Sequence, residues 1–138
     1  MEFIKWSKEV ELNVPIIDKQ HKNMVKLTNQ LYKELEANKK AQIKKILKLI
    51  VDDTKHHFET EERLIEEYKM ENFISHKLEH QRFLNKINGV YQNIKVGKSE
   101  LTIDDLNSIK VWFFNHIDFK DSKLAEHILS QKKKNIKT

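Results

Sequence analysis

Two pairs of metal-binding side chains with helical spacing constrain the fold of this 138-residue chain most strongly. His57 and Glu61 are four residues apart, and His76 and His80 repeat that spacing in the following segment. Side chains four residues apart lie one above the other on the same face of an α-helix. Imidazole nitrogens and carboxylate oxygens placed in this way can together hold a zinc, iron or manganese ion. The spacing therefore indicates a metal site between two helices.

Apolar periodicity predicts four long helices for the chain. Apolar residues recur every three or four positions, as they do on the buried face of a helix packed against its neighbours. The four expected helices cover residues 19–37, 41–67, 72–95 and 102–118. With only 2 Gly and 1 Pro, the chain has little of the turn chemistry that a sheet requires. We therefore predict an all-α, up-down-up-down four-helix bundle.

The remaining segments are expected to form an arm and a tail on a single domain over residues 1–138. Residues 1–17 read as an irregular or extended arm, because Pro15 argues against a helix running through it. Asp18 is a plausible N-cap for the first helix, and Gly97 ends the third. A short last helix through Leu124 and Ile128 is expected to fade into a basic tail at residues 130–138.

Histidines take core positions on the apolar stripes of all four predicted helices. A buried polar group without a partner lowers the free energy of unfolding by roughly 1–3 kcal/mol. Several unpartnered histidines would therefore destabilise a packed bundle. A bound metal would give all of them a partner. The histidines at these positions are His21, His57, His76, His80 and His116.

The number of candidate ligands argues for two metal ions. Five histidines and Glu61 are too many for one tetrahedral zinc, and they suit two six-coordinate ions that share bridging ligands. Asp121 is the candidate for a second carboxylate, five residues after His116. Five residues of regular α-helix turn the chain by about 500°, so Asp121 would point roughly 140° away from His116. It reaches the site only if the helix loosens into a π-type turn or ends early.

At this point the sequence resembles the hemerythrins, most closely the single-domain bacterial ones. The resemblance covers residues 6 to about 125, and its motifs are specific only in combination. The matching pieces are Trp6, Ile17-Asp18-Lys19-Gln20-His21, His57-Phe58-x-x-Glu61-Glu62, His76-x-x-x-His80 and His116-Ile117-x-x-x-Asp121.

The resemblance implies two non-haem iron ions, joined by an oxo or hydroxo bridge, that bind O2 reversibly for transport, storage or delivery. Glu61 and Asp121 would bridge the irons. His76, His80 and His116 would complete one iron. His21 and His57 would bind the other and leave it one open position for O2.

Apolar residues near the ligand positions are candidates for the wall of an O2 pocket, with ordinary core packing as the alternative. These candidates are Met24, Phe58, Trp112, Phe113 and Ile117. Asp18, Glu62 and Glu79 are either partners that orient the histidine rings or solvated helix residues. His56 and His127 have no counterpart in the motif and are expected to be surface or supporting histidines.

An oxygen-binding protein is favoured over an enzyme, because five neutral imidazoles and two carboxylates leave the cluster cationic. Ferritin-like di-iron proteins use four glutamates and two histidines instead. A di-iron enzyme (an oxidase or a peroxide or NO reductase) is the alternative, as is an O2- or redox-sensing or iron-handling module. A zinc peptidase, from the H-x-x-E-H pattern of residues 76–80, leaves the other ligands unexplained.

Composition bears on partners and location. The chain has no Cys, which excludes disulfides and iron–sulfur clusters. The net charge of +5 is spread over helix surfaces, apart from the lysines at 132–134, so no nucleic acid is expected to bind. Neither a signal peptide nor a membrane span is recognisable. We expect a cytoplasmic monomer whose partner is O2.

Overall fold

The computed structural model describes residues 3–71 and 73–137, except for the side chains of residues 135–137. All of the described secondary structure is helical. The elements are η1 (Lys8–Val10), α1 (Pro15–Glu36), α2 (Lys40–Glu67), α3 (Ile74–Lys95), α4 (Ile103–His116), the π-helix η2 (Ile117–Asp121) and α5 (Ser122–Lys137).

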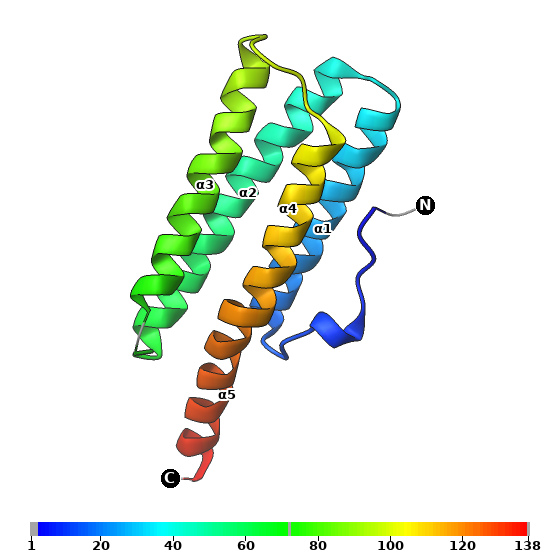
Figure 1. Cartoon of the computed structure of the whole chain (residues 1–138). Helices are drawn as coiled ribbons and strands as arrows, with labels where there is room; N and C mark the ends of the chain where they lie inside the picture. Colours follow the sequence, from blue (N-terminus) through cyan, green and yellow to red (C-terminus); the bar gives the residue numbers. More distant parts are fainter. Residues whose placement is uncertain (1–2, 72, 138) are drawn as a thin grey trace.

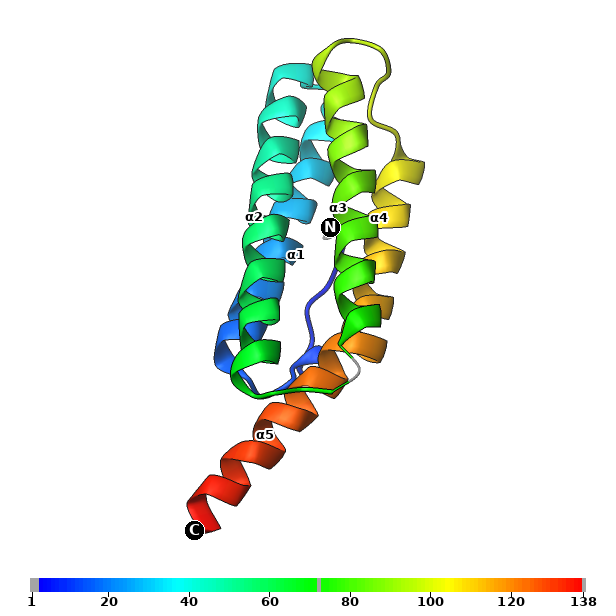
Figure 2. The same ribbon diagram turned by 90° about the vertical axis from the view of Figure 1, so that its left-hand side faces the viewer.

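Helices α1 to α4 form an up-down-up-down bundle in which consecutive helices run antiparallel (Figure 1). The N-terminal arm lies along the outside of this bundle, and α5 continues from α4 through η2. Figure 2 shows α5 projecting past the end of the bundle at which α1 begins. The predicted all-α bundle with an N-terminal arm and a C-terminal helix is confirmed.

The first helix begins earlier than the sequence suggested, and Asp18 does not cap it. Pro15 occupies the first turn of α1, where its fixed φ suits a helix and its missing N–H is no loss. Asp18 accepts a hydrogen bond from the backbone N–H of Leu12 at 2.8 Å. Its carboxylate therefore holds the arm against the start of α1.

The other boundaries follow local chemistry. Asn38 and Gly97 adopt positive φ angles of 54° and 78° and separate consecutive helices. Thr102 and Asp105 form a reciprocal capping box at the start of α4. The expected first residue of the third helix, Asn72, lies outside the described residues. The fourth helix gives way to η2 after His116, two residues before its expected end.

The last helix is longer than expected. Instead of fading at the lysines at 132–134, α5 continues through them to Lys137.

None of the helices in the described part of the chain is long and apolar enough to cross a membrane.

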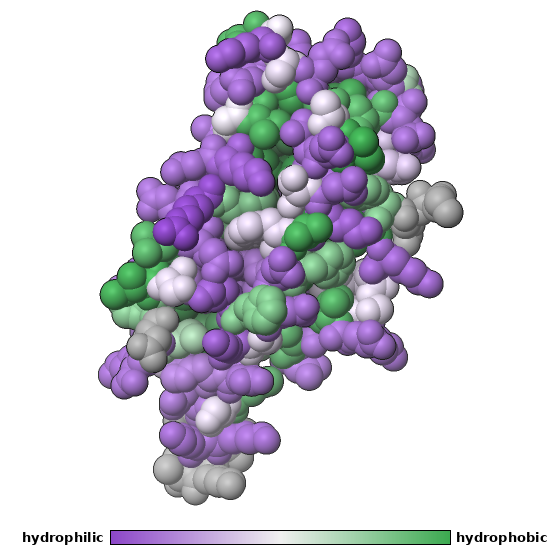
Figure 3. All heavy atoms as spheres, viewed as in Figure 1, coloured by the Kyte–Doolittle hydropathy of each residue, from purple (hydrophilic) through white to green (hydrophobic). Residues whose placement is uncertain are grey.

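Apolar packing fills the bundle on both sides of its middle. One cluster, which includes Leu47, Phe83 and Leu106, occupies the half toward the α1–α2 and α3–α4 loops. A second joins Ile17 and Leu124 at the opposite end. Apolar side chains also reach the surface over the N-terminal end of α3 (Figure 3). The exposed ones there are Phe73, Ile74 and Leu78.

Candidate metal centre

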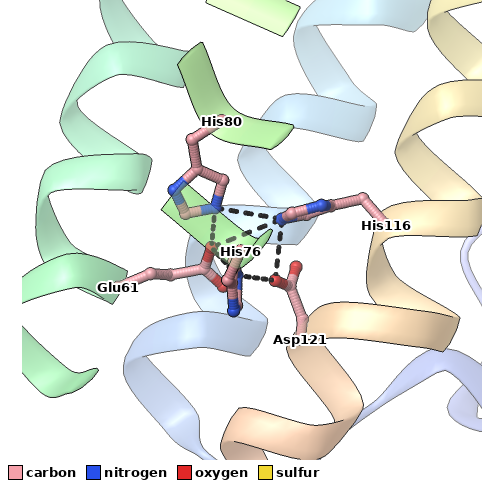
Figure 4. Close-up of side chains that lie close together, drawn as sticks. All are labelled: Glu61, His76, His80, His116 and Asp121. Carbon is pink, nitrogen blue, oxygen red and sulfur yellow. Dashed lines mark hydrogen bonds and ion pairs between the residues drawn. The ribbon is translucent and has the colours of Figure 1, made fainter. Parts of the chain in front are cut away.

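The seven metal-ligand candidates all lie inside the bundle, and none is more than 2% exposed. Each of the four long helices contributes at least one of them, and Asp121 comes from η2. Five of the seven converge in Figure 4. The structure therefore brings together side chains that are up to 100 positions apart in sequence.

The candidate ligands form two groups that share both carboxylates. Within each group, one ligand atom from every residue lies within 4.8 Å of all the others. The larger group contains Glu61, His76, His80, His116 and Asp121. The smaller group contains His21, His57, Glu61 and Asp121.

Glu61 and Asp121 each turn one oxygen toward each group. Glu61 Oε1 lies 3.0 Å from His80 Nε2, and Glu61 Oε2 lies 3.5 Å from His57 Nε2. Asp121 Oδ1 lies 3.0 Å from His116 Nε2, and its Oδ2 lies 2.9 Å from His21 Nε2. This is the arrangement that two carboxylates adopt when they bridge two cations.

Asp121 reaches the centre because the backbone is a π-helix from Ile117 to Asp121. The Ser122 amide donates to the Ile117 carbonyl, five residues back. A π-turn takes up one more residue than an α-turn, so the fifth residue after His116 returns to the same face. The π-type loosening expected at this position is thus present.

The polar atoms at the centre lack the partners that buried groups require. Both carboxylate oxygens of Glu61 and Nε2 of His57 are buried without a hydrogen bond. All five histidines turn Nε2 toward the carboxylates. Unpartnered buried acceptors are costly and rare in folded proteins. This set of nitrogen and oxygen donors fits metal ions, which would satisfy them together.

Comparison with known proteins agrees with this chemistry. The model of the family described as "Hemerythrin HHE cation binding domain" matches residues 12–128. The chain belongs to the hemerythrin family. That match takes in all four long helices and all seven metal-ligand candidates.

Individual hemerythrins align over most of the chain. The bacteriohemerythrin of Stenotrophomonas maltophilia (strain R551-3) is 26% identical over 129 residues, which cover 93% of this chain and 83% of that protein. The bacteriohemerythrin of Clostridium acetobutylicum is 27% identical and covers 88% of this chain and 98% of its own length. The crystal structure of wild-type hemerythrin superposes with a TM-score of 0.86 at 24% identity, covering 90% of this chain and 96% of that one.

Around this hemerythrin site, a chain of hydrogen bonds orients His57. Gln20 Oε1 lies 2.6 Å from His57 Nδ1, and Gln20 Nε2 donates to the Thr60 hydroxyl at 3.1 Å. The Thr60 hydroxyl donates in turn to the carbonyl of His56. Gln20 was not among the sequence candidates, and its one signal was its place directly before His21 in the matching motif.

Carboxylates lie near the outward-facing Nδ1 atoms of two histidines in the larger ligand group. Glu79 Oε1 lies 3.3 Å from His116 Nδ1, and Lys120 Nζ lies 3.7 Å from the second oxygen of Glu79. Glu62 stands farther off, 4.0 Å from His80 Nδ1. Of the three acids considered as orienting partners, Glu79 thus makes such a contact, whereas Asp18 holds the arm.

Burial and charge shift the pKa values at the centre in opposite directions. Burial lowers the pKa of His57 to about 4, so this ring is neutral at pH 7. Burial also disfavours the charged form of His116, yet the negative charges of Asp121 and Glu61 beside it raise its pKa to about 10. The pKa values of Glu61 and Asp121 are lowered despite burial, because histidines surround both carboxylates. In the absence of a metal, His116 is therefore protonated at pH 7, and its positive charge partly balances the two carboxylates.

The candidate pocket residues lie against the histidines. Phe58 stacks on His80 at 3.8 Å between ring centroids, and Trp112 stacks on His116 at 4.6 Å. Phe113 meets the ring of His21 edge-on at 5.6 Å. Met24 and Ile117 belong to the same apolar cluster as Phe113.

The two remaining histidines lie outside the centre. His56 is exposed, and Nε2 of His127 contacts the Tyr68 carbonyl. Neither belongs to the two groups of candidate ligands.

Proposed function

We propose that this protein binds O2 reversibly at a centre of two non-haem irons, for oxygen transport, storage or delivery. The observation that carries the proposal is the pair of shared carboxylates. Each belongs to both groups of ligands, and each has one oxygen beside histidines of the larger group and the other beside a histidine of the smaller group.

In this proposal His76, His80 and His116 hold one iron, and His21 and His57 hold the other. Glu61 and Asp121, which belong to both groups, would be shared by the two irons. The smaller group has one histidine fewer, so the exchangeable position belongs beside His21 and His57. Two ferrous ions would together supply the two electrons that reversible O2 binding uses.

The protein's own contribution is to position the ligands and exclude water. Gln20 and Glu79 fix the rings of His57 and His116 through their Nδ1 atoms. Met24, Phe113 and Ile117 form an apolar cluster beside His21, with exposed fractions of 7%, 5% and 1%. A dry environment on this side favours the release of intact O2, because water would supply the protons with which reduced dioxygen leaves as peroxide.

Iron content and absorption spectra test the proposal. Protein produced with ample iron should contain about two irons per chain, and the His76→Ala variant should lose most of them. The exposed His56 supplies the control, since His56→Ala should keep both. A spectrum that changes in air and returns under argon supports an O2 carrier.

Two other outcomes would reject the proposal. One zinc per chain without iron would remove the di-iron centre. Continuous O2 consumption with an added reductant, without a reversible oxygenated spectrum, would assign the centre to an enzyme.

A further inference from the structure

A buried hydroxyl about one helical turn before the candidate ligand His57 on α2 has no hydrogen-bond partner. Three threonines of α1 and α2 are buried, namely Thr28, Thr54 and Thr60. Thr28 and Thr60 each donate to a backbone carbonyl one turn back in their own helix, at 2.8 and 3.1 Å. Thr54 is 0% exposed and its Oγ1 makes no hydrogen bond.

Thr54 shares the inward face of α2 with the candidate ligands. It precedes Glu61 by seven residues, about two helical turns, so the two side chains point in nearly the same direction. His57 and Phe58 lie on the turn between them. The hydroxyl is therefore carried on the side of α2 that faces the interior of the bundle.

Helix directions place Thr54 in the same layer as the pocket candidates. Gln20 of α1 and Thr60 of α2 are hydrogen-bonded, and the rings of His21 and His57 are 4.7 Å apart. Three residues onward in α1 is Met24, and three residues back in α2 is Thr54. Because α1 and α2 are antiparallel, both steps move about 4.5 Å along the bundle in the same direction.

The same step on α4 leads from His116 back to Phe113, because α4 runs parallel to α2 (Figure 1). Phe113 touches the ring of His21 and packs with Met24. The layer next to the smaller ligand group thus combines two large apolar side chains with one free hydroxyl.

We propose that the Thr54 hydroxyl donates a hydrogen bond to the small molecule, dioxygen or an anion of two or three atoms, that binds beside His21 and His57. This inference deepens the function proposed above and rests on it. An unpaired buried donor is costly in the ligand-free protein. That cost is recovered when a ligand with an acceptor atom enters, so the hydroxyl favours a polarised ligand over an apolar one of equal size.

Azide, a triatomic anion, provides the probe. Azide is titrated into the oxidised, iron-loaded protein and its binding is followed by absorbance. A hydrogen bond to a charged acceptor corresponds to roughly a 10- to 100-fold change in affinity, so Thr54→Val should weaken azide binding by about that factor. Thr54→Ser keeps the hydroxyl and should bind azide nearly as the wild type does.

Thr28→Val is the matched control, because it removes a buried hydroxyl that already has a backbone partner. It should leave azide affinity unchanged. Valine has the size of threonine, so a purely space-filling role for Thr54 predicts no change in Thr54→Val. Unchanged azide affinity in that variant, with two irons retained, would overturn the inference and leave the proposed function standing.

A second measurement needs no iron. In the metal-free protein Thr54→Val removes an unpaired buried hydroxyl, so its thermal midpoint should rise by about 2–6 °C relative to wild type. Thr28→Val should give no such rise. If Thr54→Val fails to raise the midpoint, the hydroxyl already has a partner in the protein and the inference is wrong. Absence of iron in the wild type would instead reject the proposed function, and this comparison would still decide the state of the hydroxyl.

Discussion

The amide of Gln20 determines which nitrogen of His57 carries the proton. The Thr60 hydroxyl donates to the His56 carbonyl, so its oxygen is free to accept from Gln20 Nε2. Gln20 Oε1 therefore faces His57 Nδ1, at 2.6 Å. Because an amide oxygen can only accept, Nδ1 carries the proton and Nε2 keeps its lone pair for a cation.

Gln20→Leu should weaken metal binding by about 10- to 100-fold, the range typical of partners that orient ligand histidines. Affinity falls because, without the Gln20 amide, no hydrogen bond fixes the tautomer or the ring orientation of His57. Competition with a coloured chelator measures the affinity, and Gln30→Leu on the exposed side of α1 is the control. Equal affinities for the Gln20 variant and wild type would show that packing alone orients the ring.

Phe113→Ala separates a pocket role from plain packing. Loss of this buried ring should cost about 3–5 kcal/mol of stability. If Phe113 also excludes water from the side of His21, the oxygenated form should decay faster while iron content stays near two per chain. Timing that decay, at a temperature where both proteins are folded, decides the matter. An unchanged decay rate would leave Phe113 a core residue only.

Stability of the metal-free protein should peak near pH 6.5. His57 has a folded pKa of about 4, below its usual 6.5, so the unfolded chain binds the proton first and stability falls as pH drops through this window. His116 has a folded pKa of about 10, so the stability it contributes is lost as pH rises from 6.5 toward 10.

Urea midpoints of the metal-free protein at about pH 5, 6.5 and 9 check this profile. The iron-loaded protein should show a flatter profile, because ligands held by a metal neither gain nor lose protons in this range. A midpoint that rises steadily from pH 5 to 9 would mean that the His116–Asp121 pair contributes little.

Among the elements, η2 shows where sequence periodicity reaches its limit. Six of the seven candidate positions follow from regular apolar stripes, because α-helical geometry alone places them inward. Asp121 does not, since its direction depends on five residues of π-helix. The spacing of His116 and Asp121 indicated that the backbone must deviate from a regular α-helix, but it left open whether the deviation is a π-turn or an early helix end.

A displaced carboxylate tests whether η2 keeps its geometry. Asp121→Asn should lose metal, because a neutral amide replaces a shared carboxylate. Adding Lys120→Asp places a carboxylate four residues after His116, the spacing at which a regular α-helix would serve. With η2 intact, the double variant should remain as metal-poor as Asp121→Asn. Recovery of both irons would show that the segment relaxes to an α-helix.

In the whole molecule, the candidate ligands tie all four long helices to one centre. Bound metal should therefore stabilise the bundle as a unit, by mass action on the folded state. Iron removal should lower the thermal midpoint clearly, and iron added back should restore it. Coincident melting curves for the two forms would contradict this coupling.

The bundle itself could be predicted from sequence because each stripe is long and regular. Details at the helix ends could not. Asp18 is a residue type that often caps helices, but α1 begins three residues earlier at Pro15. The Asp18 carboxylate instead accepts a hydrogen bond from Leu12 in the arm. Gln20 of α1 contacts His57 of the neighbouring helix α2. The periodicity of α1 alone cannot reveal this contact, because the contact depends on how α2 packs against α1.

The π-helix also sets a condition for anyone who would rebuild this site in a designed protein. Idealised bundles use uninterrupted α-helices, which make backbones easy to specify. Seven side chains grafted onto such a scaffold would leave Asp121 facing away, although it is a residue that reaches both halves of the cluster. The extra residue between His116 and Ser122 must be copied as backbone, and the supporting packing copied with it, for the graft to place both oxygens.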